Sequence, residues 1–114
     1  MTPFELNKEL INKFPQLIKN FEEETSWQDG FDTGSITVFE DIFMPYVIYC
    51  IENDLSDEIK KIFGYIEECT TSSDSYKKTV VDVAIIENIH SYDIAEKIVP
   101  HLLPASLKAY NDSK

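Results

Sequence analysis

The sequence has 114 residues, 43% of them apolar, and a formal net charge of −11 at pH 7, so it is long enough for one domain with its own hydrophobic core. All ten basic residues are lysine, and without the planar guanidinium group of arginine an acidic chain is a poor candidate for a nucleic-acid reader or a nucleotide-transfer enzyme. The longest apolar stretch, residues 42–51, is too short to cross a bilayer and no signal peptide is visible, so we expect a single domain over residues 1–114 in the cytoplasm, without membrane contact.

The N-terminal third of the chain is predicted to form two short helices and a loop. Residues 2–5 have the pattern of a capping box with proline at the first helical position, which starts a helix. Pro15 is expected to end this helix and to open a second one, which carries the Glu22–Glu24 run on its solvent side. Residues 27–35 contain two of the three glycines and are predicted to form an ordered loop.

Residues 36–50 place apolar side chains at helical spacing. We expect Ser35 to be the N-cap of this helix and Pro45 to kink it, because proline removes a backbone hydrogen bond and crowds the preceding turn. The β-branched residues within 36–39 also suit a short strand, and this alternative stays open.

The second half of the chain is predicted to be helical throughout. Residues 55–69 show one apolar stripe behind an acidic helix start, and residues 76–89 are apolar around most of the circumference, which indicates a central helix. Short helices are expected on either side of Pro104, with a frayed tail at residues 111–114. The fold class is therefore predicted to be all-α, a compact single domain of six or seven short helices, and stacked helical pairs are also compatible with the pattern.

The excess negative charge is confined to one part of the chain. Residues 20–59 contain eleven acidic residues and no lysine, whereas acidic and basic residues are balanced elsewhere. A solvated surface explains each carboxylate singly but not their segregation, because interspersed lysines would relieve the repulsion. We predict a surface for a cationic protein partner, not for nucleic acid. The predicted partner-binding residues are Glu22, Glu23, Glu24, Trp27, Asp29, Asp32, Glu40 and Asp41.

Aromatic residues in the same window could anchor such an interface. Trp27, Phe31 and Tyr46 lie among the carboxylates, and tight interfaces combine central aromatic anchors with a charged rim. Packing of Trp27 beneath the loop, as part of the core, is the alternative.

The sequence offers little material for catalysis. Cys50 and Cys69 are in phase with apolar neighbours and are predicted to be reduced, buried thiols. His90 and His101 have no carboxylate or thiol at motif spacing, and no nucleophile elbow, phosphate loop or calcium loop is present. We therefore expect no catalytic residues, no metal and no cofactor.

Several short patterns along the chain together resemble a known family. They are Phe14-Pro15-x-Leu17, the Glu22–Glu24 run, Trp27, Thr33-Gly34-Ser35, Val38-Phe39-x-Asp41-x-Phe43-x-Pro45-Tyr46, Ile62-Phe63-x-Tyr65-Ile66-Glu67 and Asp74-x-Tyr76. With these patterns the sequence resembles small acidic immunity proteins of bacterial polymorphic and contact-dependent toxin systems. The resemblance implies that the chain binds and neutralises a cognate toxin domain, often a basic nuclease, inside the producing cell.

Two other functions stay open at this point. A small carboxylate- or metal-dependent enzyme would use Asp29, Asp32, Glu40 and Asp41, and an acidic regulatory adaptor would bind a basic protein unrelated to toxins. The residues do not determine the oligomeric state, although we expect a monomer.

Overall fold

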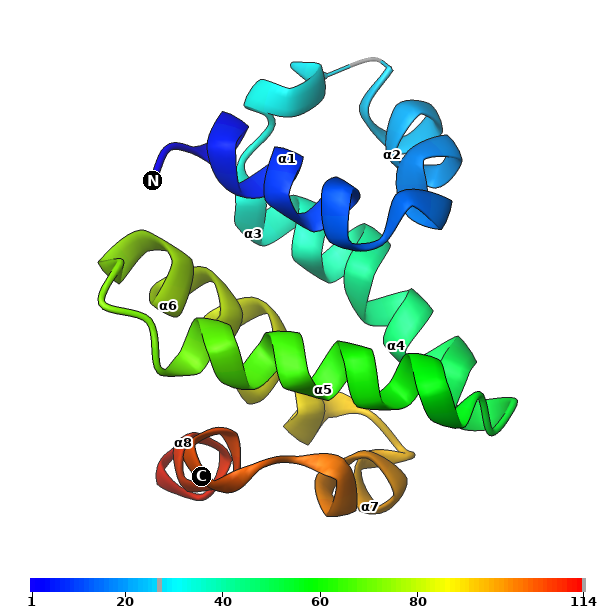
Figure 1. Cartoon of the computed structure of the whole chain (residues 1–114), viewed down its shortest axis with the longest axis vertical. Helices are drawn as coiled ribbons and strands as arrows, with labels where there is room; N and C mark the ends of the chain where they lie inside the picture. The colour runs from blue at the N-terminus through cyan, green and yellow to red at the C-terminus, as the bar shows by residue number, and fades with distance from the viewer. Residues whose placement is uncertain (27, 114) are drawn as a thin grey trace.

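The chain folds as a succession of helices joined by short turns (Figure 1). The computed structural model describes residues 1–26 and 28–113, and this part of the chain contains no strand. The α-helices are α1 (Pro3–Lys13), α2 (Ile18–Thr25), α3 (Ser35–Val38), α4 (Met44–Glu52), α5 (Ser56–Thr70), α6 (Ser75–Val81), α7 (Ala95–Ile98) and α8 (Pro104–Asp112). The 3₁₀ turns are Pro15–Leu17, Gly30–Asp32, Glu87–Ser91 and Val99–His101, and the π-helical turns are Phe39–Phe43 and Asp82–Ile86.

Several of these elements run into one another without a break. Residues 35–52 form one continuous helix, as do residues 75–91, so the described part of the chain has seven helices. The predicted all-α domain is therefore confirmed. The radius of gyration of the Cα atoms is 13.3 Å, the value expected for one compact domain of this length.

The first helix begins where the capping box predicts. The Thr2 hydroxyl accepts a hydrogen bond from the Glu5 amide at 3.2 Å, and the Glu5 carboxylate accepts one from the Thr2 amide at 2.8 Å. Pro15 then opens the 3₁₀ turn that leads into α2, as expected for a residue without an N–H group.

The continuous helix of residues 35–52 confirms the helical alternative for residues 36–39. It widens into a π turn at Phe39–Phe43, where the Met44 amide donates to the Phe39 carbonyl. Pro45 explains the wide turn, because this residue has no N–H for the Asp41 carbonyl and its ring crowds that carbonyl. The distortion predicted at Pro45 is therefore present as a π turn.

The core joins both halves of the chain. Phe43 is fully buried and contacts three other rings, with centroid distances of 5.2 Å to Phe14, 5.6 Å to Phe39 and 6.1 Å to Tyr65. The two π turns pack against each other, and α5 packs against both α6 and α8. Figure 1 shows α5 and α6 between the N-terminal helices and the pair formed by α7 and α8.

The helix of residues 75–91 is central, as its apolar circumference predicts. Its buried apolar side chains are each at most 1% exposed, and they are Val80, Val81, Ala84, Ile85, Ile86 and Ile89. Among the apolar residues within positions 80–89, only Val83 lies at the surface, with 37% of its area exposed. Across the described residues, none of the helices has both the length and the apolar character needed to span a membrane.

Candidate functional site: an acidic face

The predicted acidic residues lie on or next to three elements, one of which, α2, contacts the other two. Helix α2 packs against both the 3₁₀ turn Gly30–Asp32 and the π turn Phe39–Phe43. Six of the seven carboxylate residues are exposed and Glu40 is half-buried. Trp27, the remaining predicted site residue, lies outside the described residues. We define the acidic face as Glu22, Glu23, Glu24, Asp29, Asp32, Glu40 and Asp41.

No lysine among the described residues forms an ion pair with the acidic face. The ion pairs within residues 1–26 and 28–113 all use acidic residues from outside the 20–59 window, and they are Met1–Asp74, Lys13–Glu68, Lys77–Glu9, Lys78–Asp82 and Lys108–Asp112. The carboxylates of the acidic face also accept no hydrogen bond from any described residue. Their charge is therefore available to solvent or to a partner.

The Glu22–Glu24 run occupies an unfavourable place on its helix. Helix α2 ends at Thr25, so the three carboxylates lie in its last turn, which contains no basic residue. The negative end of the helix macrodipole repels anions there, at about 0.3–1 kcal/mol each. Asp57 and Glu58 lie instead in the first turn of α5, where negative charge stabilises the helix. Helix stability therefore accounts for Asp57 and Glu58 but not for the Glu22–Glu24 run.

The later acidic residues of the window have different surroundings. Glu52 and Asp54 line a hollow of about 540 Å³ together with Lys60 and Lys97. The Glu58 carboxylate accepts a hydrogen bond from Gln16 Nε2 at 2.6 Å. The acidic surface without a nearby lysine therefore covers fewer residues than the lysine-free stretch of the sequence, residues 20–59.

A buried asparagine holds the loop that carries Asp29 and Asp32. Asn7 is fully buried, and its Nδ2 atom donates to the carbonyls of Phe31 at 3.0 Å and Thr33 at 2.7 Å. The prediction that Ser35 is the N-cap is wrong. Gly34 occupies the N-cap position, and the Ser35 hydroxyl donates instead to Asn7 Oδ1 at 2.9 Å. Asn7 was not predicted as a functional residue, because its only signal in the sequence is a polar residue in helical phase with Leu10 and Ile11.

Two of the three aromatic residues predicted as anchors, Phe31 and Tyr46, are half-buried and pack against the core. Phe31 stacks on Phe21 with a centroid distance of 4.5 Å. Burial raises the pKa of the Tyr46 hydroxyl, which also accepts a hydrogen bond from Gln16 Nε2 at 2.6 Å. Tyr49 is the exposed aromatic residue on α4, with 56% of its area accessible.

The matched family covers almost the whole chain. Residues 7–114 match a family model described as "Domain of unknown function (DUF7674)". The chain belongs to the DUF7674 family. No curated protein and no solved structure matches it. The family description names no activity, so the resemblance to immunity proteins stays a prediction.

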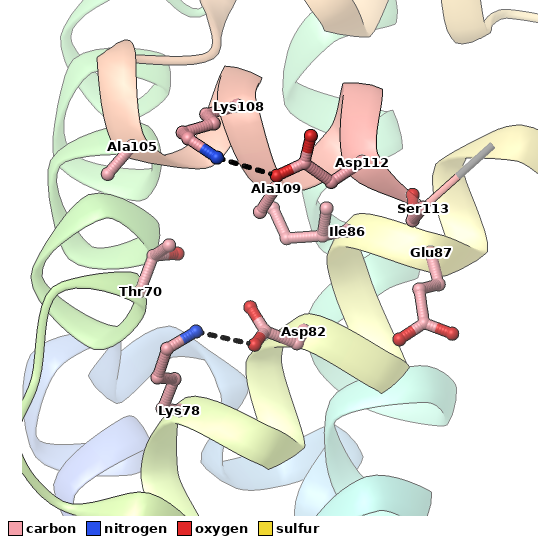
Figure 2. Close-up of a pocket in the computed structure, with 10 residues that line it drawn as sticks. All are labelled: Thr70, Lys78, Asp82, Ile86, Glu87, Ala105, Lys108, Ala109, Asp112 and Ser113. Atoms are coloured by element: carbon pink, nitrogen blue, oxygen red, sulfur yellow. Dashed lines mark hydrogen bonds and ion pairs between the residues drawn. The ribbon is translucent and has the colours of Figure 1, made fainter.

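A second surface feature of this DUF7674 domain is a groove of about 580 Å³ between α8 and the helix of residues 75–91 (Figure 2). Lys78 and Lys108 point into it from opposite sides, and each pairs at 2.8 Å with the aspartate four residues further along, Asp82 or Asp112. Both ammonium groups are thereby neutralised within their own helices. The groove is consequently a poor site for phosphate, which needs uncompensated positive charge.

The thiols of the DUF7674 domain are buried in the core. Cys50 and Cys69 are buried and unbonded to each other, as predicted. Burial raises the pKa of both thiols, that of Cys69 to about 12, so the thiolate is not populated at neutral pH. Among the side chains that the structure describes, no three of His, Cys, Asp or Glu converge as a metal-ligand set.

Proposed function

We propose that this DUF7674 domain is an immunity protein that binds and neutralises a cognate toxin domain, a basic nuclease, through its acidic face. The observation that carries the proposal is a set of seven exposed or half-exposed carboxylates on adjoining elements with no lysine partner among the described residues. Self-repulsion of this kind lowers folding stability, and a cationic partner relieves it. The resemblance to immunity proteins supports the same role.

The chemistry of a nuclease explains why an acidic face would inhibit it. A nuclease groove must be basic to hold the phosphate backbone, so a carboxylate surface can occupy it in competition with the substrate. Electrostatic steering raises association rates toward about 10⁸–10⁹ M⁻¹s⁻¹ at low salt, which suits an inhibitor of a lethal enzyme. The domain would act in the cytoplasm as a monomeric binding protein, without catalysis, cofactor, nucleic acid or membrane contact.

The proposal is tested with the product of the adjacent gene as the candidate toxin. Co-expression of the wild-type domain is expected to rescue growth of cells that produce this protein. The variant Glu22→Lys/Glu23→Lys/Asp29→Lys is expected to bind it with an association rate at least about tenfold lower at low salt, and with little change in the dissociation rate.

A matched variant distinguishes the effect of charge on the acidic face from the effect of the total net charge. Glu87→Lys/Asp93→Lys/Glu96→Lys changes the net charge equally at three exposed residues away from the acidic face. Its association rate is expected to stay close to that of the wild type. Equal effects of the two variants, or association rates that do not vary across a salt series, would remove the acidic face from the mechanism.

A further inference from the structure

The exposed side of α4 and the preceding π turn forms a ridge next to the acidic face. Its side chains recur at spacings of one helical turn, and the burial pattern leaves each of them exposed. The opposite side of the same helix is in the core, where Met44, Val47 and Cys50 are at most 1% exposed. We define the α4 ridge as Asp41, Pro45, Tyr49 and Glu52.

Tyr49 lies at the centre of this ridge. Its exposed fraction of 56% is the largest among the exposed large hydrophobic residues, and its hydroxyl has no hydrogen-bond partner among the described residues. The helix that carries it is fixed by core packing, and a tyrosine side chain has only two torsions to order. A rigidly presented tyrosine therefore loses little conformational entropy when a partner covers it.

The charges around Tyr49 indicate what kind of partner covers it. Glu52 lies about one helical turn after Tyr49 and Asp41 lies about two turns before it, and neither carboxylate is ion-paired or hydrogen-bonded by a described residue. Three of the other exposed apolar side chains, Phe4, Leu103 and Leu107, lie beside lysines. Lys8 Nζ is 5.6 Å from the Phe4 ring centroid, and Lys108 lines a hollow with Leu103 and Leu107. A cationic partner is repelled by the lysines at those three residues. At the ridge it is attracted by Asp41, whereas the Glu52 end borders the hollow that Lys60 and Lys97 also line.

We infer that Tyr49 is the anchor of the toxin interface, packing its ring against apolar and cationic side chains of the partner while Asp41 and Glu52 pair with basic residues at the rim. This inference rests on the proposed function, because it takes the partner to be the same basic protein. It assigns different roles to the two surfaces, which share Asp41: the carboxylates of the acidic face govern the association rate, and Tyr49 on the α4 ridge governs the dissociation rate.

The test measures binding of purified adjacent-gene product to the wild type and to Tyr49→Ala, Tyr49→Phe and Tyr49→Gln by surface plasmon resonance. Tyr49→Ala and Tyr49→Gln are each expected to raise Kd at least about 30-fold, mainly through faster dissociation, as for a binding hot spot. Tyr49→Phe keeps the ring and is expected to stay within about threefold of the wild type. Leu107→Ala truncates another exposed apolar residue and is expected to leave Kd unchanged.

The outcomes separate this inference from the proposed function. Tight wild-type binding that is unaffected by Tyr49→Ala and Tyr49→Gln overturns the anchor and leaves the immunity role standing. If Tyr49→Phe binds with a Kd as high as that of Tyr49→Ala, the aromatic ring is not the group that binds the partner. Absence of wild-type binding overturns both. Circular dichroism of each variant verifies the fold, which is expected to be intact because the side chain is mostly exposed.

Discussion

Replacement of Asn7 by alanine is expected to destabilise the loop that carries Asp29 and Asp32. Asn7 is fully buried and makes three hydrogen bonds, to the Phe31 and Thr33 carbonyls and from the Ser35 hydroxyl, at distances of 3.0, 2.7 and 2.9 Å. Without the amide, buried polar groups of the loop lose their partner. Each unsatisfied buried group costs about 1–3 kcal/mol, and alanine returns about 0.5 kcal/mol through its higher helix propensity.

Two of the three hydrogen bonds, those with Thr33 and Ser35, are buried, so the expected net loss for Asn7→Ala is about 2–5 kcal/mol of unfolding free energy, a large part of the total for a domain of this size. Equilibrium unfolding in urea measures it as a lower midpoint with an unchanged slope. Asn12→Ala is the matched control, because Asn12 is exposed on the same helix and is expected to change stability by less than about 0.5 kcal/mol.

A second variant tests the direction of the hydrogen bonds. Asn7→Asp has nearly the same shape, but it replaces the donor Nδ2 with an oxygen that faces two carbonyl oxygens. It is expected to be less stable than Asn7→Ala at pH 7, where the carboxylate is charged and buried. A loss below about 0.5 kcal/mol for Asn7→Ala, or an Asn7→Asp variant as stable as the wild type, would refute the role of the amide donor.

Two further predictions concern single buried or half-buried groups. The Glu67 carboxylate accepts hydrogen bonds from the Ala105 amide at 3.0 Å and the Ser106 amide at 2.9 Å, so Glu67→Ala should cost about 1–2 kcal/mol by removing the N-terminal cap of α8. Burial alone would raise the pKa of Glu67, but these hydrogen bonds and that of the Ser106 hydroxyl lower it below the ordinary value of 4.5. The stabilisation that the charged Glu67 carboxylate gives to the folded state is complete above pH 4.5 and is lost as the pH falls through the lowered pKa. The unfolding midpoints of the wild type and Glu67→Ala should therefore converge in acid and stay apart at pH 7. Cys50 and Cys69 are buried with raised pKa values, so a thiol reagent at pH 8 should modify neither in the native protein and both in urea, and rapid native labelling would contradict their burial.

The helices were predictable because their determinants are local. The capping box at residues 2–5, the helix starts at Pro15 and Pro104 and the apolar stripe of α5 each depend on residues within a few positions of one another. The exposed positions of the Glu22–Glu24 run follow from the same periodicity. These features could therefore be predicted from the sequence and are present in the structure.

The features that were missed depend on contacts between distant residues. Ser35 and Asn7 are 28 positions apart, so the hydrogen bond that replaces the predicted cap leaves no mark in the local pattern. Tyr46 and Tyr49 lie on the same helix, and which of them faces the solvent depends on the register that the π turn before Pro45 imposes. Lys97 reaches the hollow beside Glu52 only through the packing of distant segments.

Neutralisation of the Glu22–Glu24 run distinguishes a surface kept for binding from one kept for folding. In Glu22→Gln/Glu23→Gln/Glu24→Gln the helix macrodipole no longer opposes three charges, so the unfolding free energy is expected to rise by about 0.3–1 kcal/mol per residue at low salt. The gain should shrink at high salt, because exposed charges are screened.

Glu9→Gln is the control with the opposite sign. The Glu9 carboxylate pairs with Lys77 at 2.7 Å and accepts from the Tyr65 hydroxyl at 2.9 Å, so its neutralisation should lower the unfolding free energy by about 1–3 kcal/mol. Denaturation in urea at two salt concentrations measures both. If neutralising the Glu22–Glu24 run also lowered stability, those carboxylates would be part of what holds the fold together. If the neutralised variant is more stable but associates more slowly with the toxin, the three carboxylates destabilise the fold and serve binding.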